Sequence, residues 1–419
     1  MVLGDTIAAI ATASGRGGVA VVRLSGPEAF RIAEALTGKA PRAGRMSFSK
    51  ISAAGVLIDE GVVLGFSAPH SYTGEDVVEL QCHGGSVTPR RVLEATLVAG
   101  ARLARRGEFT QRAFLNGKLD YDQAESVLKL VDAKTERAAD AALQGLGGRR
   151  KRACRDLYES ALDLSATIEH ALDISEEELP ENFLHEVAVR IDGLQKAIER
   201  EIRRAKEGRL LHDGVKVVLA GAPNAGKSSL MNALLEENRV LVSETPGTTR
   251  DSIEAWLDLD GWPIRLTDTA GIRVTENAIE REGVKRAEEL AARADLVLLL
   301  DDSPLPLAPS AVLKVHSKSD LGRGEGLNVS AKTGEGLEDL KRAIVARLEN
   351  RATDEGEPPP AQAEELVEVR ALLASARGLD LVLTANVLRT AAEKLGALAG
   401  AVYSSDMLDR LFSRFCVGK

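Results

Sequence analysis

A glycine-rich segment suited to binding a phosphate chain stands at residues 221–229, directly after the apolar run Val215–Ala220. It reads Gly-Ala-Pro-Asn-Ala-Gly-Lys-Ser-Ser, and apolar residues at helical spacing follow it. In a loop between a strand and a helix, backbone N–H groups and the positive end of the helix dipole face the phosphates. We expect Lys227 to act as a catalytic cation at the β- and γ-phosphates, and Ser228 to bind Mg²⁺ through its hydroxyl. The alternative, a glycine-rich turn that binds nothing, is disfavoured because the strand, the helix and the Lys-Ser pair are all present.

Two motifs that serve Mg²⁺ and the γ-phosphate follow in the order expected of a GTPase. Asp268 ends an apolar strand and begins Asp-Thr-Ala-Gly271, so its carboxylate would hold Mg²⁺ through a water while the Gly271 N–H approaches the γ-phosphate. Residues 247–251, Gly-Thr-Thr-Arg-Asp, lie in the sequence between the phosphate-binding segment and Asp268. A threonine there would ligate Mg²⁺ in the GTP state and release it after hydrolysis.

Recognition of the base is predicted at two segments that each follow an apolar strand. These are Ser317-Lys-Ser-Asp320 and Ser330-Ala-Lys332. Asp320 would accept two N–H bonds from a guanine edge, which adenine does not offer. The usual pattern is Asn-Lys-x-Asp, and Ser317 in place of Asn is expected to weaken packing around the base.

The residue that orients the attacking water is not evident from these motifs. Ile272 follows Gly271, where Ras-like enzymes have a glutamine. Carboxylates such as Glu280 occur in residues 275–283, but an exposed, solvated helix start explains them equally well. Asn224 is placed to coordinate a monovalent cation near the phosphates.

Composition restricts the kinds of partner. The 419 residues include 54 Lys or Arg and 63 Asp or Glu, a net charge of −9, which argues against a surface uniformly positive for nucleic acid. The basic cluster 149–152 remains, with a solvated helix face as its plainer interpretation. Aromatic residues at 3% argue against base-stacking platforms.

Three scattered cysteines, no secretory signal and no apolar run of membrane length favour a reducing cytoplasm.

The elements that must position these residues fall into four segments of a multidomain α/β protein. Residues 1–117 mix strands and helices (an α+β domain), 118–211 are helical, 212–352 alternate strands and helices, and 353–419 form a proline-rich linker and further helices. We expect a P-loop GTPase domain with a parallel sheet inserted into a discontinuous helical domain. Two connections in that sheet, 303–311 and 321–326, are too short for full crossover helices.

Strings in all three regions resemble the MnmE (TrmE) family of bacterial tRNA-modification GTPases over nearly the whole chain. Those strings are Asp5-Thr-Ile-Ala, Gly15-Arg-Gly-Gly-Val, Arg23-Leu-Ser-Gly, Ser71-Tyr-Thr-Gly-Glu-Asp, Glu79-Leu-Gln-Cys-His-Gly-Gly, Gly107-Glu-Phe-Thr, Arg112-Ala-Phe-Leu-Asn-Gly-Lys-Leu-Asp, residues 221–230 and the terminal Cys416-Val-Gly-Lys419. The phosphate-binding loop alone would indicate only the superfamily. The terminal tail and the amino-terminal strings indicate this family.

The resemblance implies modification of the tRNA wobble uridine at ring carbon five, performed with MnmG, a flavin-dependent partner, in a heterotetramer. The product is an aminomethyl or carboxymethylaminomethyl group whose one-carbon unit comes from 5-formyl- or methylene-tetrahydrofolate. The amino-terminal domain would form a homodimer and bind the folate through Arg23, Glu79, Lys118 and Lys419. The GTPase domains would pair around K⁺ and hydrolyse GTP without a separate activator.

Position by position, the resemblance also assigns ligands. The K⁺ ligands would be Asn224, Ser243, Thr245 and Thr248. Thr249 would join Ser228 and Asp268 at Mg²⁺. Glu280 would be the catalytic residue that orients the attacking water. The residues expected to contact the nucleotide are Asn224, Ala225, Gly226, Lys227, Ser228, Ser229, Ser243, Glu244, Thr245, Pro246, Gly247, Thr248, Thr249, Asp268, Thr269, Ala270, Gly271, Lys318, Asp320, Ser330, Ala331 and Lys332.

Two alternatives stay open at this point. Cys416 is either a small hydrophobe near the chain end or a participant in the modification chemistry. The chain is either the modifying GTPase or a regulatory or ribosome-assembly GTPase that modifies no base. The motifs in 215–332 are common to both functions, so the amino-terminal strings and the terminal tail carry the distinction.

Overall fold

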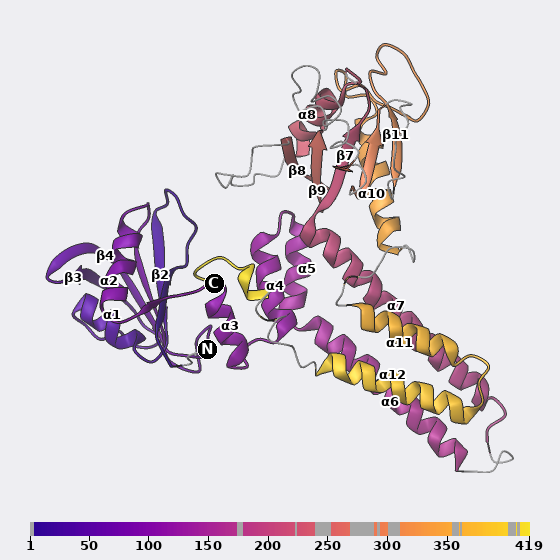
Figure 1. Cartoon of the computed structure of the whole chain (residues 1–419), viewed down its shortest axis with the longest axis horizontal. Helices are drawn as coiled ribbons and strands as arrows, with labels where there is room; N and C mark the ends of the chain where they lie inside the picture. The colour runs from indigo at the N-terminus through magenta and orange to yellow at the C-terminus, as the bar shows by residue number, and fades with distance from the viewer. Residues whose placement is uncertain are drawn as a thin grey trace. The chain divides into compact units, whose positions relative to one another are not determined.

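The computed structural model describes residues 4–173, 179–222, 224–238, 253–268, 289–290, 294–300, 311–353, 360, 363–400, 408 and 411–419. The chain forms two compact units, one of Met1–Leu128 with Val402–Lys419 and one of Lys129–Ala401 (Figure 1). The domain boundaries expected at 117, 211 and 352 stay predictions. Among the helices of the described residues, none is long and apolar enough to cross a membrane.

The first unit contains a six-stranded sheet, which confirms the expected mixed α+β composition. Its strands are β1 (Ile7–Ile10), β2 (Val19–Ser25), β3 (Met46–Ala53), β4 (Val56–Phe66), β5 (Val77–His83) and β6 (Arg102–Leu103), in the spatial order β3-β4-β5-β2-β1-β6. The pairs are antiparallel except for β1 with β6. Helices α1 (Ala29–Thr37) and α2 (Thr88–Val98) pack on the face that carries Ala8, Val22 and Leu24.

Alternation along the strands turns other side chains to the opposite face of this sheet. Ile7 and Ala9 cluster there with Phe109 from α3 (Glu108–Leu115). The carboxy-terminal tail belongs to the same unit. Its Phe412 and Phe415 pack with α4 (Tyr121–Asp132), and the Cys416 carbonyl accepts a bond from the Gly107 N–H at 3.3 Å.

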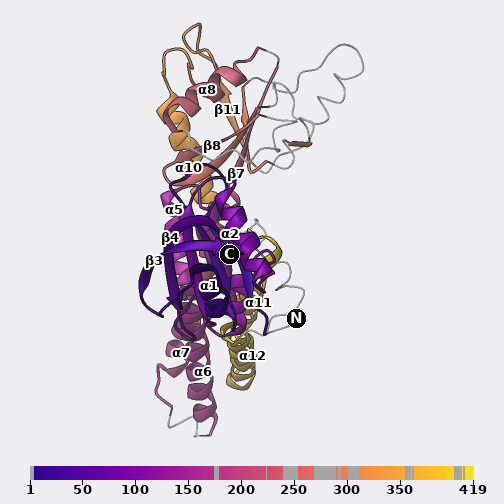
Figure 2. The same ribbon diagram turned by 90° about the vertical axis from the view of Figure 1, so that its left-hand side faces the viewer.

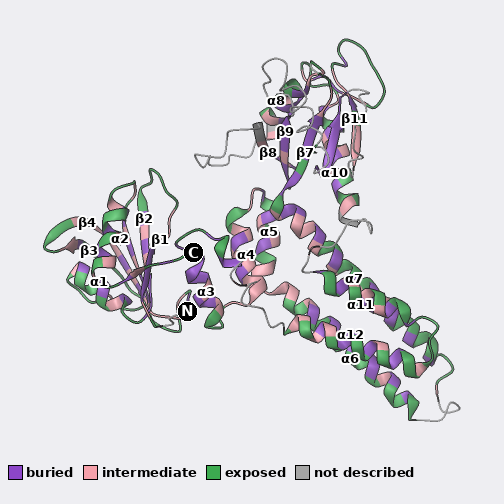
Figure 3. Ribbon diagram, viewed as in Figure 1, coloured by how far each residue is buried: buried purple, intermediate pink, exposed green. Residues whose placement is uncertain are grey.

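The helical part of the second unit confirms the expected run of long helices. It contains α5 (Glu136–Leu146), α6 (Arg149–Leu172), α7 (Phe183–Asp213), α11 (Glu364–Ser375) and α12 (Leu381–Ala399). Helix α12 lies along α6 and α11 along α7 (Figure 2). Apolar residues three or four apart, such as Leu157, Ala161, Leu164 and Ile168, form a buried stripe, whereas the outer faces are exposed (Figure 3).

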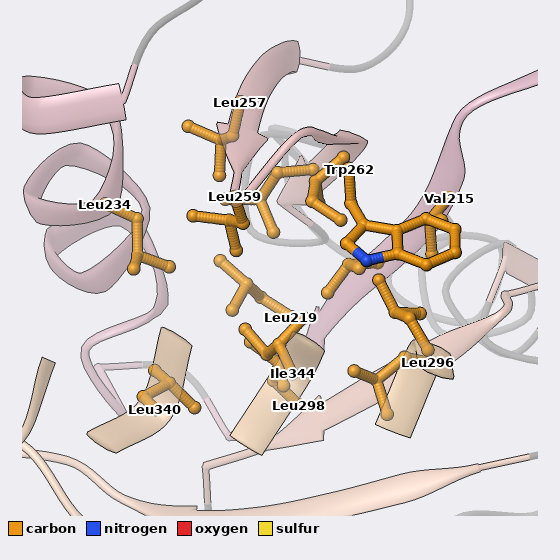
Figure 4. Packing of buried hydrophobic residues seen from close by; sticks show 14 of the residues in the cluster. Val215, Leu219, Leu234, Leu257, Leu259, Trp262, Leu296, Leu298, Leu340 and Ile344 are labelled. Carbon is orange, nitrogen blue, oxygen red and sulfur yellow. The ribbon is translucent and has the colours of Figure 1, made fainter. Parts of the chain in front are cut away.

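The second sheet of the chain also lies in this unit and is mainly parallel. Its strands are β7 (Val215–Ala220), β8 (Ile253–Leu259), β9 (Trp262–Asp268), β10 (Leu296–Leu299), β11 (Val312–His316) and β12 (Leu327–Asn328), in the order β12-β11-β10-β7-β9-β8. Only β8 pairs antiparallel, with β9. One face packs on α8 (Lys227–Asn238) and α10 (Leu337–Thr353) through a dense aliphatic core (Figure 4). The connection 321–326 holds no helix, as expected, while 303–310 lies outside the described residues.

Helices α5 and α7 fix this sheet at the end remote from the phosphate-binding loop. Helix α7 runs into β7 through Gly214, whose φ of +74° favours glycine and whose added Cβ would lie 2.4 Å from the Trp256 ring. The Arg137 guanidinium lies 4.3 Å from the Trp262 ring centroid and 2.5 Å from Glu207 of α7. The sheet and these helices therefore share one packed core.

An ion-pair network around the buried Arg112 and Glu108 joins four segments of the first unit. Arg112 is 2% exposed, and its guanidinium lies 2.6 Å from Asp5, 3.0 Å from Glu75 and 3.3 Å from Glu108. Arg102 completes the network with contacts of 2.7 Å to Asp5 and 2.6 Å to Glu108. Hydrogen bonds from Arg102, assisted by Arg112, lower the pKa of Asp5; the same two guanidiniums outweigh burial and lower the pKa of Glu108. The network ties α3 to β6, to the segment before β1 and to the loop before β5.

Replacing Arg112 with leucine should destabilise the first unit by about 3–5 kcal/mol at pH 7, because the buried carboxylate of Glu108 and the partly buried carboxylates of Asp5 and Glu75 would lose a partner. Groups with depressed pKa values stabilise the fold above their ordinary pKa and lose that contribution on acidification. The difference from wild type should therefore shrink as the pH falls below the ordinary values of 3.8 for Asp and 4.5 for Glu. Native-state hydrogen exchange of the α3 amides measures this difference in the free energy of unfolding. Arg90→Leu, which removes an exposed pair with Glu94, is the control and should cost less than about 1 kcal/mol; equal effects of the two changes would contradict this role for Arg112.

Candidate nucleotide-binding site

The parallel pairing of β7 with β9 brings the phosphate loop and Asp268 to one edge of the sheet. Leu219 of β7 lies opposite Asp268, the last residue of β9, and the loop 221–226 begins two residues after Leu219. The Ser228 hydroxyl donates to Asp268 at 2.6 Å, although 40 residues separate them. The structure thus brings together the two predicted Mg²⁺ residues that it describes.

The phosphate loop has the backbone conformation that its glycines allow. Gly221 and Gly226 have φ of +145° and +94°, and Asn224 adopts the left-handed region at +66°. Lys227, the first residue of α8, is 6% exposed and donates from Nζ to the carbonyls of Gly221 at 2.7 Å and Ala222 at 2.8 Å. Its ammonium therefore lies over the loop at the amino end of α8, where phosphate oxygens are favoured.

The segment predicted to bind guanine contacts the phosphate loop directly. The Ser317 hydroxyl donates to the Ala225 carbonyl, and Lys318 Nζ donates to the Asn224 carbonyl at 2.8 Å. The Asp320 carboxylate accepts a 2.7 Å bond from the hydroxyl of Ser330, which is fully buried. Ala331 and Lys332 follow Ser330 in the same turn. The guanine segment and the second base segment are thereby fixed to each other and to the loop.

The bond from Ser317 to Ala225 is a contact that the sequence did not predict. We expected Ser317 to weaken packing around the base, and its effect on guanine affinity stays a prediction. The sequence did carry a signal for this bond. Ser317 stands where the usual motif has Asn, and a hydroxyl can donate a hydrogen bond just as a side-chain amide can.

Several predicted site residues lie outside the described residues. They are Ser243, Glu244, Thr245, Pro246, Gly247, Thr248, Thr249, Thr269, Ala270, Gly271 and Glu280. Asn224, Ala225, Gly226 and Ser229 lie in the described loop and the first turn of α8.

The four residues assigned to folate all lie in the first unit. Arg23 Nε lies 2.9 Å from the Glu79 carboxylate, and its guanidinium is 5.7 Å from the ring centroids of both Tyr72 and Phe109. Lys118 Nζ donates to the Pro69 carbonyl at 3.0 Å. Lys419 ends the tail whose Gly418 packs against Ile10, where an added Cβ would lie 2.3 Å from the Ile10 oxygen.

Tyr72 and Thr110 are two members of this region that the sequence did not single out. The Tyr72 hydroxyl lies 2.8 Å from Thr110 Oγ1, and burial raises the pKa of Tyr72. Both residues stand in sequence strings that carry the family resemblance, and this was the signal by which they could have been found. Cys416 is exposed, and the structure leaves both of its interpretations open.

Fold and site together define a P-loop GTPase. Residues 6–118 match the family model described as "GTP-binding protein TrmE N-terminus", and residues 122–416 match "MnmE helical domain". The chain is 42% identical to the tRNA modification GTPase MnmE of Symbiobacterium thermophilum, over 99% of each chain. It is 43% identical to that of Dichelobacter nodosus, over 100% of each. The chain belongs to the MnmE family of tRNA modification GTPases, which are GTP hydrolases.

A solved structure with likeness to the chain is the G domain of the T. maritima FeoB iron transporter. It is 29% identical and covers 32% of this chain and 98% of its own, with a TM-score of 0.24.

Ser317→Ala should lower the affinity for GDP and GTP about 3- to 10-fold, because the Ala225 carbonyl loses its donor and one hydrogen bond contributes about 0.5–1.5 kcal/mol. Dissociation of a fluorescent guanine nucleotide in a stopped-flow instrument measures the change. Ser319→Ala is the matched control, since the buried Ser319 Oγ has no hydrogen-bond partner among the described residues and should be dispensable. An effect of Ser319→Ala as large as that of Ser317→Ala would refute this role for the Ser317 bond.

Proposed function

We propose that the chain is a K⁺-activated GTPase that acts with an MnmG-type flavoprotein on the wobble uridine of tRNA. The pair would install an aminomethyl or carboxymethylaminomethyl group at carbon five, using the one-carbon unit of a tetrahydrofolate, in the cytoplasm. One observation carries the proposal: the match to relatives named tRNA modification GTPases covers 99–100% of the chain. It therefore includes the amino-terminal unit and the tail as well as the nucleotide-binding region.

Each site residue is assigned a part in GTP hydrolysis; Thr249 and Glu280 take theirs from the family resemblance, because they lie outside the described residues. The loop amides and Lys227 would bind the β- and γ-phosphates, while Ser228, Thr249 and, through water, Asp268 would hold Mg²⁺. A hydroxyl and a carboxylate 2.6 Å apart are the hard oxygen ligands that suit this ion, which supplies charge neutralisation at the phosphates. Glu280 would orient the water that attacks the γ-phosphorus, with GDP as the leaving group.

The proposed K⁺ ligands are Asn224, Ser243, Thr245 and Thr248, all oxygen donors. Bound K⁺ supplies positive charge that other GTPases obtain from an arginine. The described member, Asn224, supports this role through its exposed side chain and through a backbone fixed by Lys318. Pairing of two GTPase domains would bring this charge to the phosphates.

The folate part of the proposal rests on the first unit. Arg23 and Glu79 form an ion pair beside two aromatic rings, a setting suited to a flat ring with hydrogen-bonding edges. Lys118 and Lys419 would attract the carboxylates of the ligand. The homodimer is supported by apolar side chains exposed on the edge strand β3 and its neighbour β4: Met46, Phe48, Val56 and Leu57.

Loss of the gene should leave the wobble uridines of total tRNA without the carbon-five group, as measured by mass spectrometry of digested tRNA. Re-expression of the wild-type chain should restore the group, and the Lys227→Ala chain should not. Unaltered wobble uridines in the deletion strain would favour the rival function, a regulatory or ribosome-assembly GTPase.

In K⁺ the purified chain should hydrolyse GTP at least tenfold faster than in Na⁺, because K⁺ supplies transition-state charge. Glu280→Ala should lower kcat in K⁺ by about 10²-fold or more, as expected for loss of a group that handles the attacking water. Glu282→Ala, two residues away, is the control and should hydrolyse normally. Equal rates in the two salts would reject cation activation, and normal hydrolysis by Glu280→Ala would reject the role of Glu280.

A further inference from the structure

The last four residues of the chain form a tight turn. The Lys419 N–H donates to the Cys416 carbonyl at 3.4 Å, so Val417 and Gly418 are the two central residues of this turn. Gly418 has a φ of +103°, a backbone conformation that glycine adopts readily and that strains a residue with a side chain. We name residues 416–419 the tail turn.

Aromatic packing anchors the residues that precede the tail turn. Phe412 and Phe415 are both buried, with ring centroids 5.9 Å apart, and the Phe114 ring of α3 lies 6.3 Å from that of Phe412. Gly107, which caps α3 with a φ of +66°, allows this close approach, because an added Cβ would lie 2.6 Å from the Phe412 oxygen. The backbone therefore enters the tail turn from a fixed position in the first unit.

The tail turn itself is held against the ends of two strands. Val417 forms an antiparallel bridge with Arg106, just after β6, and the Cys416 carbonyl accepts a second bond from the Gly107 N–H at 3.3 Å. At Gly418, an added Cβ would lie 2.3 Å from the Ile10 oxygen at the end of β1. Because that oxygen belongs to the backbone, it cannot rotate away. Glycine is thus required at residue 418 for two independent reasons, its φ and the space beside it.

This seat adjoins the strand that carries one of the residues assigned to folate. Ala9, the neighbour of Ile10 on β1, pairs with Arg23 of β2, and Arg23 pairs in turn with Glu79 of β5. Adjacent strands lie about 4.7–4.9 Å apart. An extended ligand of linked rings therefore reaches from the Arg23–Glu79 ion pair across β1 to the tail turn.

The exposure of the tail turn argues against a role confined to covering the edge of the sheet. Its apolar side chain, Val417, is 45% exposed, and Cys416 is exposed as well. The part that packs tightly is the Gly418 backbone. The turn therefore fixes the path of the chain to Lys419 while burying little apolar surface of its own.

We propose that Gly418 is a positioning residue for the folate: it holds the tail turn at the end of β1 and so presents Lys419 to the carboxylates of the ligand. The inference rests on the folate part of the proposed function. A lysine on a mobile chain end loses conformational entropy each time a ligand orders it, whereas a docked turn has lost that entropy on folding. Gly418 acts only through Lys419 and does not touch the ligand.

The test replaces Gly418 by alanine of either hand. Residues 1–415 as a thioester can be ligated at Cys416 to the synthetic peptides Cys-Val-Gly-Lys, Cys-Val-(L-Ala)-Lys and Cys-Val-(D-Ala)-Lys, which restores the full-length chain. Isothermal titration calorimetry then measures the affinity for 5-formyl-tetrahydrofolate. The L-alanine chain should bind at least tenfold more weakly than the glycine chain. The D-alanine chain should bind within about threefold of it, because a D residue favours a positive φ.

Hydrogen exchange separates the position of the tail turn from its charge. The Gly107 amide, which donates to the Cys416 carbonyl, should exchange at least tenfold faster in the L-alanine chain, while the β2 and β5 amides keep their protection and report a folded first unit. Lys419→Gln should also weaken folate binding, yet it should leave exchange at Gly107 unchanged. Unchanged folate affinity in Lys419→Gln would overturn the part assigned to Lys419.

A matched glycine in the same unit is the control. Gly38 has a φ of +68°, but an added Cβ there meets no atom within 4 Å. Gly38→Ala therefore introduces similar backbone strain without displacing the tail turn, and it should bind the folate within about twofold of wild type. A loss in Gly38→Ala equal to that of the L-alanine chain would show general destabilisation and overturn the proposal.

The remaining outcomes separate this inference from the function beneath it. Folate affinity that is unchanged in the L-alanine chain, or that falls equally with D-alanine, would overturn the positioning role of Gly418 and leave the folate site standing. A wild-type chain that does not bind 5-formyl-tetrahydrofolate would instead contradict the folate part of the proposed function.

Discussion

The register of two parallel strands is the constraint on which the nucleotide site depends. Because β7 and β9 run in the same direction with Leu219 opposite Asp268, the loop after β7 and the last residue of β9 meet at one edge. Slipping the register by one residue would turn Asp268 to the other face of the sheet. Aliphatic packing of the strands against α8 and α10 maintains the register that the Ser228–Asp268 bond requires. The chemistry of the site thus rests on apolar residues that touch no nucleotide.

Polar contacts then connect the loops that this edge brings together. Ser317 and Lys318 hold consecutive carbonyls of the phosphate loop, so recognition of the base and binding of the phosphates are mechanically linked. At the opposite end of the sheet, Arg137, Trp262 and Glu207 join it to the helices. Strand β9 thus extends from Trp262, at the end held by the helices, to Asp268, at the nucleotide site.

Charge is distributed unevenly between the parts of this acidic chain. In the first unit, three carboxylates surround the buried Arg112 and stabilise the packing of α3 against the sheet that carries Arg23 and Glu79. In the second unit, a groove between α6 and α7 is lined by three cations and three acids: Arg190, Arg200, Arg204, Asp156, Asp163 and Glu201. A net charge of −9 argues against a uniformly positive surface.

The sequence by itself determined the fold class, the family and the identity of the phosphate-loop residues, because glycine spacing and strand–helix alternation are local patterns. It also indicated that residues 321–326 are too short for a helix. Only the tertiary structure decided that Ser317 bonds Ala225, 92 residues away, and that Arg112 holds three carboxylates of distant segments. The same holds for the ion pair of Arg149 with Glu201, since the approach of 149–155 to 196–204 depends on how two helices pack. Local spacing specifies which element forms, whereas partners distant in sequence are selected by burial and register, which exist only once the chain has folded.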